Sequence, residues 1–164
     1  MKLVTMGALM GGLMLGACAT TSGGGAPQAA ETIRYETSPC FGACPVYAVT
    51  VSSDGSGRFE GKRFTAVTGG RTFAVTPQQF ADFKRRLQPY RPADGERRIA
   101  AGNADCGQVI TDQPGAAVTW SGGDAPPATL SLYYGCTAPE LAAMKQALHA
   151  APEALPIGGF VAKH

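Results

Sequence analysis

The sequence predicts an α+β fold, in which an antiparallel sheet of about five or six strands packs two helices on one face. Several short segments alternate apolar and polar residues, and two longer segments have the apolar spacing of amphipathic helices. The 22 glycines and 12 prolines favour short elements joined by turns over a helical bundle. With 45% hydrophobic and 16% charged residues, the chain can bury a core.

The first half of the domain is expected to form strands joined by tight turns. The predicted strands span residues 32–37, 46–52, 57–64 and 71–75. In the second strand, Tyr47, Val49 and Val51 share one face. Asp54 and Gly55 are typical of a hairpin turn, and Gly69 and Gly70 predict the next one.

A helix is expected directly after these strands. Thr76 can cap it, Pro77 suits the first helical position, and Gln79 completes a capping box with Thr76. Pro89 and Pro92 are expected to end it. The apolar stripe that would face the core consists of Phe80, Phe83 and Leu87.

The second half is expected to hold a hairpin and a second helix. Residues 90–107 are predicted as a loop, 109–111 as a short strand, and 116–120 with 129–134 as a hairpin. Thr137 and Glu140 predict a capping box for the second helix, which is expected to end near Pro152. Its apolar stripe consists of Leu141, Met144 and Leu148.

The N-terminus has the features of a secretory signal in residues 1–17. Lys2 precedes an apolar stretch, 3–15, that is too short for a membrane-spanning helix. The following Leu15-Gly16-Ala17-Cys18 resembles the bacterial lipobox, which implies that the Cys18 thiol accepts a diacylglyceryl group. The alternative is ordinary cleavage after the Ala-x-Ala pattern of residues 17–19, which would remove Cys18 and release a soluble protein.

After Cys18 we expect a flexible tether and then one domain. Residues 18–31 are small and mostly uncharged, and residues 32–164 form the predicted single α+β domain. Ala19 follows the cysteine where inner-membrane lipoproteins carry Asp. By resemblance to lipoprotein sorting, this favours the outer membrane, with the domain facing the periplasm.

Four cysteines remain, and an even number in an exported chain indicates disulfides. Of three pairings we favour Cys40 with Cys44, across a turn freed by Gly42, and Cys106 with Cys136. The Cys-x₃-Cys spacing departs from the Cys-x-x-Cys of thioredoxin-like proteins, so redox chemistry is the secondary interpretation. A zinc site is weaker still, because the second pair lacks a short spacing and exported thiols tend to oxidise.

The segment around the first two cysteines carries a family resemblance. Residues 40–47 read Cys-Phe-Gly-Ala-Cys-Pro-Val-Tyr, followed by Asp54-Gly55 and by Glu-Gly-Lys-Arg-Phe at 60–64. This pattern resembles a family of uncharacterised bacterial exported domains marked by Cys-Phe-Gly-x-Cys-Pro-x-Tyr. The resemblance covers about residues 33–87 and does not include Cys106 or Cys136. It supports the fold and implies no activity.

Catalytic motifs are missing from the sequence. His149 and His164, the two histidines, have no acid or nucleophile at a recognised spacing, and no phosphate-binding, dinucleotide-binding or hydrolase signature occurs. We therefore predict a protein that is not an enzyme and that needs neither cofactor nor metal. The formal net charge of +2 does not favour nucleic-acid binding.

Two surfaces are candidate contacts. The cations near residues 84–98 could meet anionic headgroups, although a solvated helix face and loop explain them more simply. Trp120, Tyr133 and Tyr134 could form an aromatic platform, but core packing is the simpler interpretation because neighbours alternate between sheet faces. The candidate cations are Lys84, Arg85, Arg86, Arg97 and Arg98.

The sequence thus predicts a lipid-anchored protein of the cell envelope that works as a non-enzymatic binding or structural module. Its expected partners are the membrane, through the N-terminal lipid, and an unidentified envelope component. The alternative is a periplasmic thiol–disulfide protein that uses Cys40 and Cys44.

Overall fold

The computed structural model describes residues 1, 3, 29–93 and 95–162. The predicted lipidation site Cys18, the rest of the predicted signal apart from Met1 and Leu3, and most of the predicted tether lie outside the described residues. Among the described residues, none of the helices combines the length and apolar character that crossing a membrane requires.

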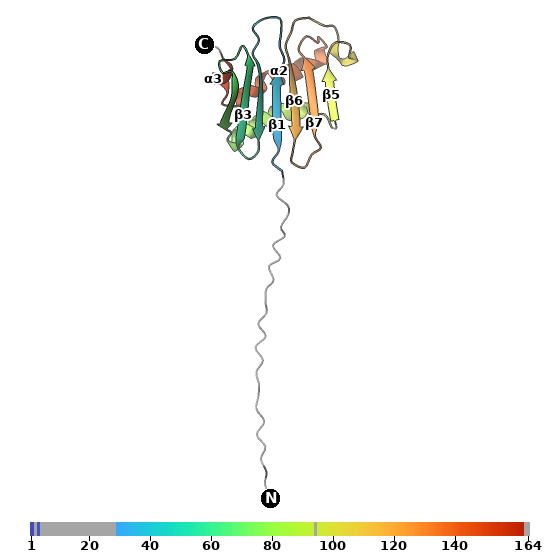
Figure 1. The fold of residues 1–164 in the computed structure, drawn as a ribbon. Helices are drawn as coiled ribbons and strands as arrows, with labels where there is room; N and C mark the ends of the chain where they lie inside the picture. The colour runs from blue at the N-terminus through green and yellow to red at the C-terminus, as the bar shows by residue number, and fades with distance from the viewer. Residues whose placement is uncertain (2, 4–28, 94, 163–164) are drawn as a thin grey trace.

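Seven strands form one mixed sheet, with the order β4-β3-β2-β1-β6-β7-β5. Figure 1 shows β1 in the middle of the sheet, although it comes first in the chain. The α+β class is confirmed, but the expected five or six purely antiparallel strands are not. The strands are β1 (Thr32–Thr37), β2 (Val46–Ser52), β3 (Ser56–Arg63), β4 (Gly69–Ala74), β5 (Gly95–Ile99), β6 (Gly115–Ser121) and β7 (Ala128–Tyr133).

The additional strand is β5, which occupies part of the predicted loop 90–107 and pairs with β7 in parallel. Its sequence, GERRI, contributes only one buried side chain, Ile99, because it is an edge strand. An exposed charged segment of this kind shows no alternating apolar pattern, and this is why the sequence did not reveal it. The predicted strand 109–111 is also wrong, since only Val109 forms an isolated bridge, with Cys136.

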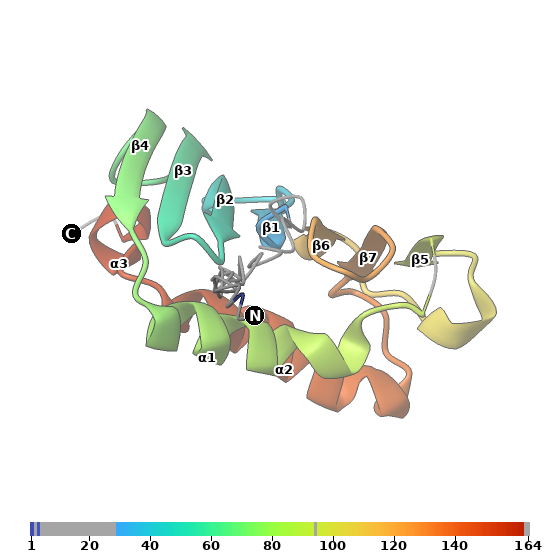
Figure 2. The same ribbon diagram turned by 90° about the horizontal axis from the view of Figure 1, so that it is seen from below.

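The two longer helices cover the same face of the sheet (Figure 2), as predicted. Helix α1 (Pro77–Leu87) has the expected capping box, because the Gln79 amide donates to Thr76 Oγ1 at 3.2 Å and the Thr76 amide donates to Gln79 Oε1 at 2.9 Å. Its predicted stripe is buried against the sheet. Helix α2 (Ala142–Ala150) likewise buries Met144 and Leu148.

The predicted start of the second helix is wrong. Thr137 Oγ1 donates to the Gln108 carbonyl at 3.0 Å instead of capping a helix. The chain then turns through a short 3-10 helix, Pro139–Leu141, and α2 begins at Ala142 without a side-chain cap. After α2, the 3-10 turn Ala151–Ala154 and the short helix α3 (Gly158–Val161) complete the described chain. Two further 3-10 turns are Gln88–Tyr90 and Ala104–Cys106.

The core lies between the sheet and the helices. On the β2–β3 side it is aromatic: Tyr47 stacks on Phe59 with ring centroids 5.4 Å apart, and Phe59 in turn contacts Phe160 of α3. On the β6–β7 side, Trp120 is fully buried among aliphatic residues, and its indole nitrogen has no hydrogen-bond partner among the described residues. Trp120 therefore packs in the core, which confirms the simpler of the two interpretations of this residue.

Candidate functional site

The structure brings together the two cysteine pairs that the sequence favoured. The Cα atoms of Cys40 and Cys44 are 5.8 Å apart, and those of Cys106 and Cys136 are 4.6 Å apart, each pair forming a disulfide. Cys40 and Cys44 are half-buried, whereas Cys106 and Cys136 have no exposed surface. All four therefore serve as crosslinks, and one of the two bonds lies near solvent.

The loop closed by Cys40 and Cys44 joins β1 to β2 and presents an aromatic side chain. Gly42 has a φ of 141°, which an L side chain rarely adopts, and this allows the tight turn. Phe41 is 88% exposed, while its amide donates to the Asp112 carbonyl at 3.1 Å. The backbone of Phe41 is thus fixed while its ring stands in solvent. Because a residue between two cysteines of a short turn can hardly be buried, the exposure of Phe41 could have been predicted from the sequence.

Hydrogen bonds connect this loop to the second disulfide. The Ile110 amide donates to the Gly135 carbonyl at 2.8 Å, and Tyr133 Oη donates to the Ile110 carbonyl at 2.9 Å. Ile110 is itself 58% exposed. We call this region, residues 38–45, 106–114 and 133–138, the disulfide end of the sheet; the β1–β2 connection lies at the top of Figure 1.

An apolar groove of about 610 Å³ adjoins the disulfide end on the helix side of the sheet. One wall is formed by Ala43 and Pro45 from the disulfide loop. Phe64, which directly follows β3, also lines the groove, and its φ of 55° is unusual for a bulky residue. Such backbone strain gathers at functional positions. The remaining lining residues are Tyr47, His149, Pro152, Glu153, Leu155, Ile157, Gly158, Val161 and Ala162.

Beneath this groove lies a tyrosine cluster. Burial, together with the neighbouring tyrosines, raises the pKa of Tyr35 and of Tyr47 far above the ordinary range. Burial also raises the pKa of Tyr134, whose ring stacks on His149 with centroids 6.4 Å apart. These hydroxyls stay protonated at every physiological pH, so the cluster offers packing and hydrogen bonding rather than a base or a nucleophile.

The opposite, uncovered face of the sheet holds a second groove, of about 700 Å³, which we call the sheet groove. Glu36 lies at one side, held by Lys62 and by Arg34, whose Nη2 is 3.3 Å from its carboxylate. Although burial opposes it, the hydrogen bond from Lys62 and the charge of Arg34 hold the pKa of Glu36 below its usual range. On the other side, Glu96 and Arg98 belong to β5.

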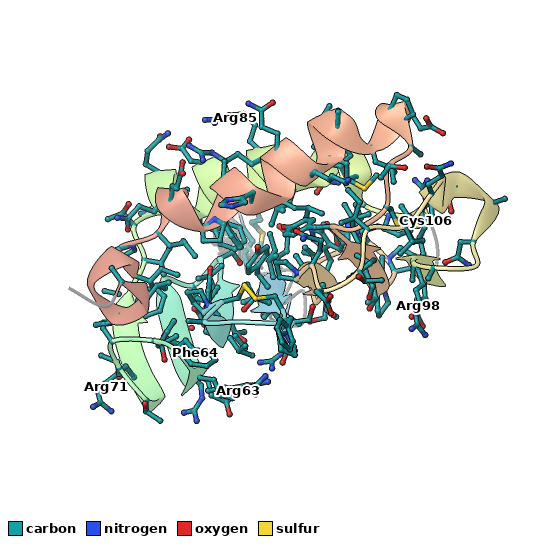
Figure 3. All side chains as sticks on the ribbon, turned by 90° about the horizontal axis from the view of Figure 1, so that it is seen from above. Arg63, Phe64, Arg71, Arg85, Arg98 and Cys106 are labelled. Carbon is teal, nitrogen blue, oxygen red and sulfur yellow. A yellow bond between two sulfur atoms is a disulfide. The ribbon has the colours of Figure 1, made fainter. Side chains whose placement is uncertain are left out.

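The five candidate cations do not form one surface. Figure 3 places Arg85 on the helix side of the molecule and Arg98 beside the uncovered face. Four of the five pair with acids of the same domain: Lys84 with Glu31 at 2.6 Å, Arg85 with Asp82 at 2.6 Å, Arg86 with Glu153 at 3.3 Å, and Arg97 with Asp105 at 3.1 Å. Arg98 has no ion pair within the described ranges.

The N-terminal residues attach at the end of the sheet opposite to the disulfide end. Residues 29–31, predicted as the last part of the tether, already hydrogen-bond to the domain. The Ala29 carbonyl accepts from the Gly123 amide at 3.0 Å, and Glu31 contacts Ser53 and Lys84. We call this region, residues 29–31, 53–55 and 121–126, the anchor end. Strand β1 runs from the anchor end to the disulfide end.

Within residues 29–93 and 95–162, no three His, Cys, Asp and Glu side chains converge in a way that could hold a metal ion. His149, one of the two histidines of the sequence, lies beside Tyr134 and the apolar groove.

Comparison with known proteins identifies a family without an assigned activity. The model of a domain of unknown function, DUF6438, matches residues 31–152, and the chain belongs to this family. The match includes all seven strands and both longer helices, and it ends before α3. Neither a curated protein nor a solved structure gives a significant match.

Proposed function

We propose that this protein is a lipid-anchored module of the cell envelope that binds a partner at its disulfide end and is not an enzyme. The acylated residue would be Cys18, in the outer membrane, with the domain facing the periplasm. The lipobox-like residues 15–18 support the anchor. The observation that carries the binding role is Phe41, an exposed aromatic ring on a backbone that a disulfide and a hydrogen bond hold in place.

The arrangement of the two ends supports the same proposal. Residues 29–31 enter the domain at the anchor end, and Phe41 and Ile110 lie at the other end of β1. An anchor upstream of residue 29 would leave the disulfide end directed away from the lipid. Rigid aromatic side chains supply much of the binding energy in protein interfaces, because little conformational entropy is lost when they are covered.

The anchor is tested by metabolic labelling with a palmitate analogue. The natural chain should incorporate the label and fractionate with outer membranes, and Cys18→Ser should lose both properties. If Cys18→Ser still takes up the label and remains in the membrane fraction, the anchor is assigned to the wrong residue.

The binding role is tested by photo-crosslinking in intact cells. A benzophenone amino acid in place of Phe41 should give a discrete adduct of the same mass in repeated experiments. The matched control replaces Ala125, which is also exposed but lies at the anchor end. Equal adducts from both positions, or none from position 41, would count against a binding surface at the disulfide end.

A second candidate, thiol–disulfide exchange, is favoured by one observation: Cys40 and Cys44 are half-buried where Cys106 and Cys136 are fully buried. An attacking thiolate would form a mixed disulfide with one sulfur and release the other as a thiolate. The reduction potential of the pair decides the matter. A value near about −270 mV, the thioredoxin range, supports exchange, and a value well below about −300 mV marks a structural bond.

A further inference from the structure

The sheet groove lies on the uncovered face, and its floor is made of small side chains. Strand register places Glu36 beside Ala117, Ala117 beside Ser131, and Ser131 beside Arg98. At a strand spacing of about 4.8 Å, the backbones of Glu36 and Arg98 lie about 14 Å apart. The floor between them, Ala117 and Ser131, is too small to fill this width, so a shallow trough with a charged side chain at each edge results.

The two edges offer different chemistry. At one edge the Glu36 carboxylate is already held by Arg34 and Lys62. At the other edge Arg98 has no ion pair in the described part of the chain, and a guanidinium can bind a carboxylate through two parallel hydrogen bonds. Glu96, two residues earlier on the same face of β5, adds an acceptor for hydroxyl or amide hydrogens.

An aromatic side chain held by two hydrogen bonds also lines the sheet groove. Tyr133 Oη donates to the Ile110 carbonyl at 2.9 Å and accepts from the Gln113 amide at 3.2 Å. A ring fixed in this way loses little entropy when a ligand covers it. The apolar C–H face of a sugar can stack on such a ring. The sugar hydroxyls can donate hydrogen bonds to carboxylates and accept them from cationic side chains.

The position of the trough argues against an extended peptide as its ligand. Peptides that pair with sheets do so along an exposed edge, where backbone groups are free to bond. The floor of the sheet groove, Ala117 and Ser131, lies on β6 and β7, whose backbone groups are already engaged by a strand on each side, and only its rim at Arg98 belongs to the edge strand β5. Recognition must therefore come from side chains, which suits a ligand rich in hydroxyl groups.

We propose that the sheet groove binds a carboxylate-bearing glycan, with the carboxylate on Arg98 and a sugar ring against Tyr133. This inference names a ligand class for the proposed binding module and rests on that proposed function. The residues that line the sheet groove do not include Phe41.

The test compares two disaccharides with the full-length protein in detergent micelles, followed by NMR titration. One contains N-acetylglucosamine and N-acetylmuramic acid, which carries a carboxylate; the other is the neutral diacetylchitobiose. We expect amide shifts at Ala117 and Ser131 and about tenfold tighter binding of the acidic disaccharide. Arg98→Ala should abolish this preference and leave the weaker binding of the neutral sugar.

The matched control is Arg97→Ala. Arg97 precedes Arg98 on β5, points to the other face of the sheet and pairs with Asp105 at 3.1 Å, so its loss should leave the preference unchanged. The proposal is overturned if neither disaccharide shifts the groove amides at millimolar concentration, if Arg98→Ala keeps the preference, or if both variants lose it equally. None of these results bears on the anchor or on the binding role of Phe41, which the acylation and crosslinking experiments test independently.

Discussion

The Cys40–Cys44 and Cys106–Cys136 disulfides lie at the same end of the sheet but differ in loop length and in burial. The first spans four positions of the chain in an exposed turn, and the second spans thirty and is fully buried. Because a crosslink restricts the unfolded chain more when its loop is longer, the chain-entropy model assigns them about 2 and about 3.6 kcal/mol.

The difference indicates a division of roles. The buried bond joins the segment after β5 to the segment after β7, two parts that share little regular structure. The half-buried bond adds less to stability but fixes the backbone that carries Phe41. Stability therefore depends mainly on Cys106–Cys136, and the shape of the disulfide end on Cys40–Cys44.

The largest expected effect comes from replacing both Cys106 and Cys136 by Ala. We expect the free energy of unfolding to fall by about 3–4 kcal/mol, since a long loop is released in the unfolded chain. Urea denaturation followed by circular dichroism measures this loss. A decrease below about 1 kcal/mol would contradict the assignment of the main stabilising role to this bond.

Replacing Cys40 and Cys44 by Ser should cost less, about 2 kcal/mol, because the released loop is short. The same denaturation experiment applies. The ranking of the two double variants is the sharper criterion: if the Cys40/Cys44 variant is the less stable of the two, the comparison drawn from loop length and burial fails.

Tyr133→Phe removes the hydroxyl that links Ile110 and Gln113. A loss of about 1 kcal/mol is expected, the usual net value of a hydrogen bond. Hydrogen exchange at the Gln113 amide should also accelerate. Unchanged protection of that amide would show that the loop between the two disulfides holds its position without Tyr133.

The smallest effect on stability is expected for Phe41→Ser. Because the ring is 88% exposed, the free energy of unfolding should change by no more than about 0.5 kcal/mol. Affinity for the partner captured by crosslinking should nevertheless fall. A clear loss of stability would indicate that the ring packs on the domain, which would remove it as a binding residue.

Local sequence signals predicted the elements that carry them. Strand β1 was predicted with the correct bounds and helix α1 with the correct first residue, because alternation and the Thr76 capping box are features of adjacent residues. Strand β5 and the start of α2 were not, because each depends on distant residues: β5 forms against β7, and Thr137 is taken up by the Gln108 carbonyl.

The candidate sites show the same contrast between local features, which the sequence reveals, and neighbours that only the fold brings together. The cysteine pairing follows from a short turn and a predicted hairpin, both local features. The cluster of cations, Lys84 to Arg98, was grouped by position in the sequence, and the fold distributes it over two faces. The sheet groove could not be predicted, because Glu36, Ala117, Ser131 and Arg98 become neighbours only through strand register.

The central position of β1 has a consequence for the order of assembly. This strand is synthesised first, and β2 can pair with it at once, but its other neighbour, β6, begins only at Gly115. Until that point the growing chain exposes an unpaired edge in what will be the middle of the sheet. Delayed pairing of this kind slows folding, and a sheet that still lacks β6 is the stage most prone to aggregation.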